Sequence, residues 1–231
     1  MDLRRARQRM VETHLANRGI TGQRVLQAFL DVPREGFLPA ELAEFAYADS
    51  PLPIGEEQTI SQPYVVAMTV DALGLQGGER VLEVGTGSGY AAAILSRLAG
   101  EVYTIERIQS LATSAEKRLR ALGYTNVHVR QGDGSLGWSD HAPYHAIAVA
   151  AGGPKAPQAL LSQLAVGGRL VIPIGADETS QVLVRITRES ATEFREKAIA
   201  DVHFVPLIGE QGWRERLRAS AELPDTYPLG L

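Results

Sequence analysis

The sequence contains no cysteine. That absence excludes disulfide bridges, thiolate catalysis and cysteine-ligated metal sites, and it is typical of a reducing compartment. Long apolar runs are also absent, whereas a membrane-spanning helix needs about 18 or more apolar residues in succession. Residues 1–15 are charged and periodic, where a secretory signal would carry an apolar stretch. We therefore expect a cytoplasmic protein with no membrane partner.

Neither sign of charge is in large excess. The chain has 23 Lys and Arg against 27 Asp and Glu, a formal net charge of -4. Nonspecific binding to nucleic acid needs a broad cationic surface, so we expect no nucleic-acid partner. With 45% hydrophobic and 22% charged residues among 231, the composition is that of an ordinary globular protein with a single core.

The first part of the chain combines helical and irregular patterns. Residues 1–32 predict helices closed by Pro33, and residues 63–73 predict a helix ended by Gly74. Residues 32–55 mix prolines, aromatic and small side chains without a period, which predicts irregular structure wrapped over the rest of the chain. Long ordered loops of this kind are often functional.

From residue 79 onward, strand and helix patterns alternate, which predicts a parallel sheet in an α/β fold. The expected strands are residues 79–84, 101–106, 126–131, 145–151 and 168–175. The expected helices are residues 88–99, 110–123 and 156–165. Residues 181–188 and 193–207 predict a closing antiparallel pair.

A glycine-rich loop follows the first of these strands. The stretch "VLEVGTGSGY" places Gly85, Gly87 and Gly89 before a helix, where the backbone can turn sharply and a ligand can approach the peptide groups. No Lys-Ser or Lys-Thr pair follows, so the loop is not a phosphate-binding P-loop. A dinucleotide site would use Gly87, Gly89 and Ala92, but that motif begins two residues later than the strand end suggests.

Acidic residues stand at the ends of three successive strands. Glu106 follows the glycine loop by about 20 residues, where a carboxylate can accept both hydroxyls of a ribose. Asp133 could accept a hydrogen bond from an adenine amino group, and Glu83 lies at the end region of the first strand, one residue before Val84. These acids suit a positively charged ligand without phosphates, which favours S-adenosylmethionine. The alternative is that the glycines form only a tight turn and that the acids are solvated.

The stretch "GEEQTISQPYVV" offers hydroxyls and an amide but no base beside its serine. Methyl transfer from a sulfonium to a carboxylate needs no general base, because a carboxyl group with a pKa of about 4 is already ionised at neutral pH. Gln58, Thr59 and Ser61 could donate hydrogen bonds that orient such an acceptor. The structural alternative is that Ser61 caps the following helix, with Pro63 in its first turn.

Several motifs together resemble the protein-L-isoaspartate O-methyltransferase family, in the expected order over about residues 1–213. They are "VPREGFLP", "LPIGEEQTISQPYVV", "VLEVGTGSGYAAAIL", "YTIERI", "GDG", "PQALLSQLAVGGRLVIPIG" and "FVPLIG". The "QTISQP" element is distinctive of the family, whereas the glycine loop alone indicates only the wider class of Rossmann-like methyltransferases.

The resemblance implies a class I methyltransferase fold, a doubly wound, mostly parallel sheet of seven strands preceded by a helical extension. It also implies S-adenosylmethionine as donor and the α-carboxylate of L-isoaspartyl and D-aspartyl residues in damaged proteins as acceptor. Esterification would let the backbone nitrogen displace methanol and form a succinimide, which opens in part to normal aspartate. The implied function is repair, and we expect a monomer.

The resemblance also assigns roles to residues. The catalytic residue falls on Ser61. The acceptor contacts fall on Gln58, Thr59, Ile60, Val205, Pro206 and Leu207. The cofactor contacts fall on Glu83, Gly85, Thr86, Gly87, Gly89, Glu106, Arg107, Asp133 and Gly134.

Two departures from the family pattern affect the region before and after the fourth strand. The family usually has "YDAI" where this chain has "YHAI" with His145, and the following loop "AAGGPKAP" is richer in glycine. These changes leave open a carboxyl methyltransferase that acts on an aspartate of a dedicated biosynthetic peptide. A module that binds a nucleotide without catalysis is a second alternative.

We expect one domain over residues 1–213, with a tail over residues 214–231 that has no assigned role. Within the domain, residues 1–78 form the helical preface and active-site loop, and residues 79–213 form the cofactor-binding core. We expect no metal site. His141 and His145 have helical spacing, but Pro143 lies between them and a strand begins next.

Overall fold

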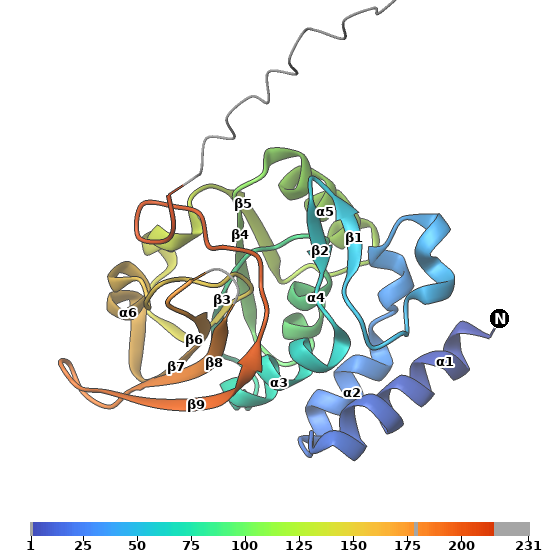
Figure 1. Cartoon of the computed structure of the whole chain (residues 1–231), viewed down its shortest axis with the longest axis horizontal. Helices are drawn as coiled ribbons and strands as arrows, with labels where there is room; N and C mark the ends of the chain where they lie inside the picture. Colours follow the sequence, from blue (N-terminus) through green and yellow to red (C-terminus); the bar gives the residue numbers. More distant parts are fainter. Residues whose placement is uncertain (1, 178–179, 215–231) are drawn as a thin grey trace, which may run out of the picture.

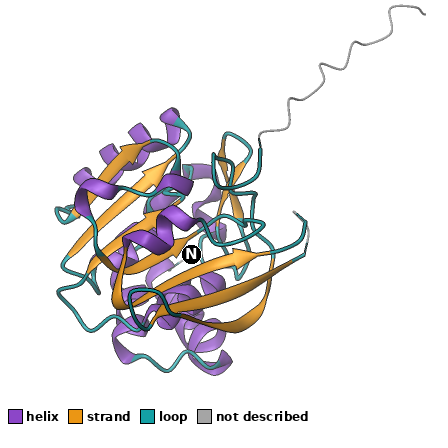
Figure 2. Ribbon diagram, turned by 90° about the vertical axis from the view of Figure 1, so that its left-hand side faces the viewer, coloured by secondary structure: helices purple, strands orange, loops and turns teal. Residues whose placement is uncertain are grey.

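The computed structural model describes residues 2–177 and 180–214, and its core is a twisted sheet with helices on both faces (Figures 1 and 2). The tail expected from residue 214 lies outside the described residues except for Arg214. No helix of the described part is long and apolar enough to span a membrane.

Within the described residues, the large sheet has seven strands in the order β5-β4-β3-β6-β7-β8-β9. The strands are β3 (Arg80–Val84), β4 (Glu101–Glu106), β5 (Val127–Gln131), β6 (Tyr144–Val149), β7 (Leu164–Ile174), β8 (Gln181–Arg188) and β9 (Phe194–Val202). Neighbours from β5 to β7 pair in parallel, and β8 pairs antiparallel with both β7 and β9. The expected mostly parallel, seven-stranded sheet is therefore confirmed.

Helices cover both faces of the sheet. Successive side chains of a strand point to opposite faces, and apolar side chains on each face pack against helices. Val81 and Val102 face one cluster of buried side chains, which also holds residues of α1 (Leu3–Met10), α2 (Gln23–Asp31), α3 (Pro63–Leu73), α4 (Tyr90–Ser96) and α5 (Gln109–Ala121). Leu82 and Ile147 face a second cluster with α6 (Gln158–Gln163). Both faces of the strands are thus apolar, as in parallel sheets generally.

The helical preface agrees with the sequence pattern. After α1 the chain continues in a π-helical turn and a 3-10 turn that end at Gly19, whose φ is 96°. Helix α2 ends as Val32 becomes extended, because the following Pro33 disfavours a helical residue before it. The preface packs on the same face as α3 and α4.

Residues 32–55 contain more regular structure than the sequence pattern predicted. They form two 3-10 turns, Arg34–Phe37 and Ala40–Phe45, and then strand β1 (Leu52–Gly55), which pairs antiparallel with β2 (Gln58–Ile60). These strands are too short to show a period in the sequence. The chain reverses between the two strands at three residues with positive φ, which are Gly55, Glu56 and Glu57. The hairpin turn contacts α5, because the Ser110 hydroxyl donates to Glu56 Oε1 at 2.7 Å.

Helix α3 begins with Pro63 and ends at Gly74, whose φ is 61°. Its N-cap residue is Gln62, and no side chain in the described part of the chain makes a capping hydrogen bond there. The interpretation of Ser61 as a helix cap is therefore wrong. The rigid proline already begins the helix, and Ser61 lies two residues before it, next to the N-cap residue Gln62.

A buried polar network lies under the glycine loop. The Oε2 atom of Glu83 accepts a hydrogen bond of 2.5 Å from the Thr104 hydroxyl, which lies 2.6 Å from the Thr86 hydroxyl. The Oε1 atom of Glu83 is buried and has no hydrogen-bond partner among the residues that the structure describes. Burial raises the pKa of Glu83 to about 8, and the nearby charge of Glu106 adds to that rise. Glu83 is thus mainly protonated at neutral pH.

We expect Glu83→Gln to change how stability depends on pH. The folded pKa exceeds the ordinary value of 4.5, so the folded protein holds a proton that the unfolded chain releases between about pH 5 and pH 8. The contribution of protonated Glu83 to the free energy of unfolding is therefore fully present at low pH. It decreases as pH rises, by at most about 1.4 kcal/mol per pH unit. Urea unfolding of wild type and Glu83→Gln across this range measures the difference.

Glu44→Gln serves as the control, because Glu44 is exposed on the turn Ala40–Phe45. The control should follow the wild-type pH profile, while Glu83→Gln gains stability relative to wild type as pH rises. Parallel profiles for all three proteins would contradict a buried, protonated Glu83.

Candidate active site

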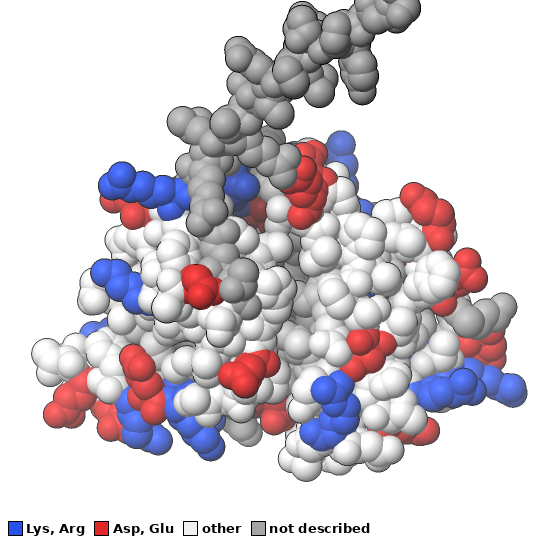
Figure 3. Space-filling model, in the orientation of Figure 1, with Lys and Arg blue, Asp and Glu red and all other residues white. Residues whose placement is uncertain are grey.

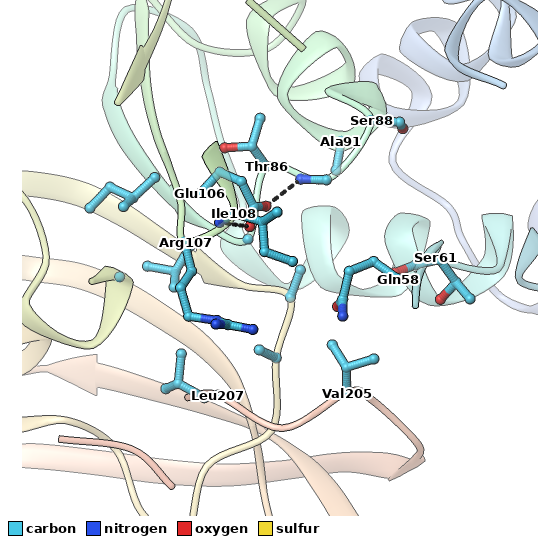
Figure 4. Close-up of a pocket in the computed structure, with 18 of the residues that line it drawn as sticks. Gln58, Ser61, Thr86, Ser88, Ala91, Glu106, Arg107, Ile108, Val205 and Leu207 are labelled. Atoms are coloured by element: carbon cyan, nitrogen blue, oxygen red, sulfur yellow. Dashed lines mark hydrogen bonds between the residues drawn. The ribbon is translucent and has the colours of Figure 1, made fainter. Parts of the chain in front are cut away.

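A cavity lies at the carboxyl ends of β3, β4 and β6. It encloses about 860 Å³, part of which is open solvent, and Figure 4 shows the side chains around it. The strand order reverses its direction between β3 and β6, and the cavity is lined there by Gly85 and Ala150. Ligands of open α/β sheets bind at this kind of switch point.

Most of the residues singled out from the sequence come together here. Those that line the cavity are Gln58, Thr59, Ile60, Ser61, Gly85, Thr86, Gly87, Glu106, Arg107, Gly134, Val205, Pro206 and Leu207. Glu83, Gly89 and Asp133 do not line it. Glu83 instead lines a smaller adjoining cavity, of which Ser61 is also a wall.

Glu106 connects the glycine loop to the end of β4. Its Oε2 accepts the Gly87 N–H at 2.8 Å and its Oε1 accepts the Ile108 N–H at 3.0 Å, as drawn in Figure 4. Each carboxylate oxygen can accept a further hydrogen bond. The residue is only 6% exposed and lines the cavity.

The conformation of the glycine loop depends on positive φ angles at its three glycines. The φ values of Gly85, Gly87 and Gly89 are 96°, 53° and 91°, a region that residues with a side chain rarely adopt. A Cβ atom on Gly89 would lie 3.2 Å from two carbons of Leu119. Gly89 therefore allows α4 to pack on α5, which is a structural contribution behind the cavity.

Asp133 faces a loop rather than the cavity. Its Oδ1 accepts the Ser135 N–H at 2.8 Å and the Ser135 hydroxyl at 2.7 Å, and its Oδ2 accepts the Glu210 N–H at 2.7 Å. A Cβ on Gly209 would collide with Asp133 Oδ1, so only glycine allows this approach. Asp133 thereby fixes the chain that follows Leu207.

The segment of Val205, Pro206 and Leu207 is held by the glycine-rich loop after β6. The Gly152 N–H donates to the Val205 carbonyl and the Leu207 N–H donates to the Gly152 carbonyl, both at 2.8 Å. A Cβ on Gly152 would lie 2.5 Å from the Gln181 side chain. The unusual glycines therefore bring this segment to the cavity.

His145 lies at the beginning of β6, whereas the cavity is at the end of that strand. Its Nδ1 accepts the Arg80 N–H at 3.1 Å, and its side chain is exposed. The histidine of the "YHAI" motif is thus not among the cavity residues.

Sequence reasoning missed other cavity residues. They are Val66, Val84, Ser88, Tyr90, Ala91, Ile105, Ile108, Ala150, Ala151 and Ile208. The position of Ala150 and Ala151 at the end of the expected strand 145–151 was a usable signal, because neighbouring parallel strands end at the same edge. Tyr90 gave no signal, since a buried aromatic side chain at the start of a helix is usually part of the core.

The cavity has few ionisable side chains. Glu106 and Arg107 are the only charged residues in its described lining, and no histidine is among them. In Figure 4 Arg107 extends from the end of β4 toward the side of Val205 and Leu207. No group of three His, Asp or Glu side chains in the described chain could hold a metal ion. This chemistry suits an adenosyl ligand without phosphates and a reaction without a histidine base.

Comparison with known proteins identifies relatives over nearly the whole chain. The family described as protein-L-isoaspartate(D-aspartate) O-methyltransferase matches residues 5–212. Protein-L-isoaspartate O-methyltransferase 1 of Rhodopseudomonas palustris is 60% identical, covering 90% of this chain and 84% of the relative. The protein of the same name from Geotalea uraniireducens is 56% identical, covering 90% of this chain and 94% of the relative.

Solved structures agree with this similarity. A protein-L-isoaspartate O-methyltransferase aligns with a TM-score of 0.79 at 30% identity, covering 89% of this chain and 67% of the other. A putative Plasmodium falciparum protein of that name, in complex with S-adenosyl-L-homocysteine, aligns with a TM-score of 0.74 at 25% identity, covering 87% and 98%. The chain therefore belongs to the protein-L-isoaspartate(D-aspartate) O-methyltransferase family.

Proposed function

We propose that the two halves of the cavity bind the two reactants, the donor beside the glycine loop and the acceptor beside Ser61. The protein is an S-adenosylmethionine-dependent protein-L-isoaspartate O-methyltransferase. The observation that carries the proposed division is that one cavity is lined both by Gly87 and Glu106 and by Ser61 and Val205.

The donor half is proposed to hold the adenosyl group. Glu106 would accept hydrogen bonds from the ribose hydroxyls through the acceptor positions that Gly87 and Ile108 leave open. Further contacts are proposed for Gly85, Thr86, Arg107 and Gly134, which line the cavity. Glu83, Gly89 and Asp133 would support these contacts from behind. When bound, S-adenosylmethionine supplies a methyl group on a positively charged sulfur.

The acceptor half is proposed to aim the α-carboxylate of an isoaspartyl residue. The hydroxyls of Ser61 and Thr59 and the amide of Gln58 would donate hydrogen bonds to it. Because this carboxylate is ionised at neutral pH, its oxygen needs no base to attack. The apolar side chains of Ile60 and of Val205, Pro206 and Leu207 would exclude water from the attacking oxygen.

The proposed product is a methyl ester. Its methoxide group is a better leaving group than the oxide that a free carboxylate would have to release. The following backbone nitrogen would attack the ester carbonyl, lose its proton and release methanol, which closes a succinimide ring. Hydrolysis of that ring gives normal aspartate in part, which is repair. D-Aspartyl residues are proposed as a second class of acceptor.

We also propose that residues 1–213 act as one domain, because Met10 and Phe29 of the preface share a buried cluster with Val81 and Val102 of the sheet. A monomer in the cytoplasm that acts on isoaspartyl proteins is the proposed working state. The balanced composition supports a partner other than nucleic acid, and on the face drawn in Figure 3 basic and acidic side chains are interspersed.

Labelled donor and matched peptides test this function directly. Peptides of one sequence that contain L-isoaspartate, D-aspartate or L-aspartate at a single position are incubated with the protein. We expect methyl ester on the isoaspartyl peptide, less on the D-aspartyl peptide, and none on the L-aspartyl peptide. Ester on none of the three, or equally on all, would count against a repair enzyme.

For Ser61→Ala we expect turnover of the isoaspartyl peptide to fall about 10- to 100-fold, because one donor that aims the acceptor is lost. Donor affinity, measured by calorimetry, should stay within about 3-fold, since Ser61 addresses the acceptor. Ser162→Ala is the matched control, because Ser162 is exposed on α6. Unchanged turnover in Ser61→Ala would remove the residue from the reaction.

For Glu106→Ala we expect donor affinity to fall about 10- to 100-fold, because hydrogen bonds to a charged group contribute about 1.5–3 kcal/mol. Calorimetry with S-adenosylhomocysteine measures this, and thermal unfolding checks that the fold is kept. Glu101→Ala is the control at the opposite end of the same strand. Equal affinity in wild type and Glu106→Ala would argue against the ribose contact.

A further inference from the structure

Arg34 is a completely buried arginine in the first 3-10 turn of the preface, Arg34–Phe37. Its exposed fraction is 0%, and its side chain does not line the cavity. Burying a guanidinium is unfavourable unless its N–H groups find acceptors. Burial accordingly lowers the pKa of Arg34, while Tyr90, Tyr47 and Asp49 act in the opposite direction.

The acceptors of Arg34 are backbone carbonyls from two distant segments. Its Nε donates to the Ala46 carbonyl at 2.8 Å, and its Nη2 donates to the Ser50 carbonyl at 3.4 Å. Its Nη1 donates to the Ser61 carbonyl at 2.9 Å. The guanidinium also lies over the Tyr90 ring, 5.0 Å from the ring centre. One side chain therefore joins residues 46–50 to the residue proposed to aim the acceptor.

Ser61 has little other backbone support. The pairing of β1 with β2 ends at Ile60, and α3 begins only at Pro63. The neighbouring Gln62 is held by the same segment, since its amide donates to the Asp49 carbonyl at 2.9 Å and to Asp49 Oδ2 at 2.8 Å. The orientation of the Ser61 peptide thus depends on residues 46–50 and on the arginine that holds both.

We propose that Arg34 is a positioning residue for methyl transfer, which fixes the Ser61 peptide so that the serine stays in the cavity wall. The inference rests on the proposed role of Ser61 and deepens it. Arg34 itself touches neither reactant. It acts by restricting the conformation of the backbone between a short hairpin and a helix, where the chain would otherwise be free to shift.

Only arginine satisfies this geometry. Its planar group presents five N–H donors in fixed directions, which reach three carbonyls at once while the flat face covers Tyr90. Lysine would keep the charge, but its single ammonium is a compact point with three donors on a flexible stem. Arg34→Lys should therefore fold and lose part of the constraint on Ser61.

A double-mutant cycle with Ser61→Ala tests the proposal. We expect Arg34→Lys to lower kcat about 10-fold or more, because small displacements of a positioning group have large effects on rate. Its affinity for S-adenosylhomocysteine should stay within about 3-fold. In the Ser61→Ala background the same Arg34→Lys change should lower kcat less than about 2-fold, because residues that act as a unit are not additive.

Arg7→Lys is the matched control. Arg7 belongs to the same preface and donates from Nη1 to the Leu30 carbonyl at 2.9 Å, but it has no contact with Ser61. We expect it to lower the unfolding temperature and to leave kcat unchanged. If Arg34→Lys does not fold at the assay temperature, Arg34→Gln replaces it, because a neutral amide is less costly to bury than an unsatisfied charge.

The outcomes separate the two ideas. If Arg34→Lys lowers kcat equally in the wild-type and Ser61→Ala backgrounds, the positioning role is overturned while the proposed function stays intact. A loss of kcat matched by an equal loss of donor affinity would overturn it as well, since that result indicates general damage. Unchanged turnover in Ser61→Ala alone would refute the role of Ser61, and the inference about Arg34 with it.

Discussion

The hydrogen bonds from Gly87 and Ile108 to the carboxylate of Glu106 are the interaction on which the site depends. They connect the glycine loop after β3 to the residue that ends β4. A loop with three positive φ angles has many conformations available when unfolded, so its order must be stabilised by contacts of this kind. Because both donors are backbone N–H groups, the carboxylate orients the loop and still has oxygen lone pairs that face the cavity.

The two halves of the cavity are built by different physical means. The proposed donor half is formed by strand ends and tight turns, which bring Gly85, Glu106 and Gly134 to one edge of the sheet. The proposed acceptor half consists of segments outside the large sheet, at residues 58–61 and 205–208. Hydrogen bonds to the backbone hold these segments, from Arg34 in one case and from Gly152 in the other.

This difference explains what sequence reasoning could and could not predict. The alternation of strands and helices and the acid at a strand end are local patterns, and the sheet and the place of Glu106 followed from them. The partners of Arg34 are carbonyl oxygens, which every residue possesses, so no side-chain pattern marks them. The hairpin was missed because Leu52–Gly55 and Gln58–Ile60 are too short for a period. The contact of Asp133 could not be predicted from a local pattern either, because its partner is the backbone N–H of Glu210, 77 residues away.

Three acids at adjacent strand ends raise a problem of mutual repulsion, and the structure gives each one a different solution. Glu83 is buried in the network with Thr104, where its raised pKa keeps it mainly neutral at pH 7. Glu106 is held by two N–H groups, and Asp133 by two N–H groups and a hydroxyl. Glu106 is thus the only acid of the three in the cavity lining. At the proposed donor site, a cationic ligand would therefore meet one carboxylate, that of Glu106, which is fixed by its hydrogen bond to the glycine loop.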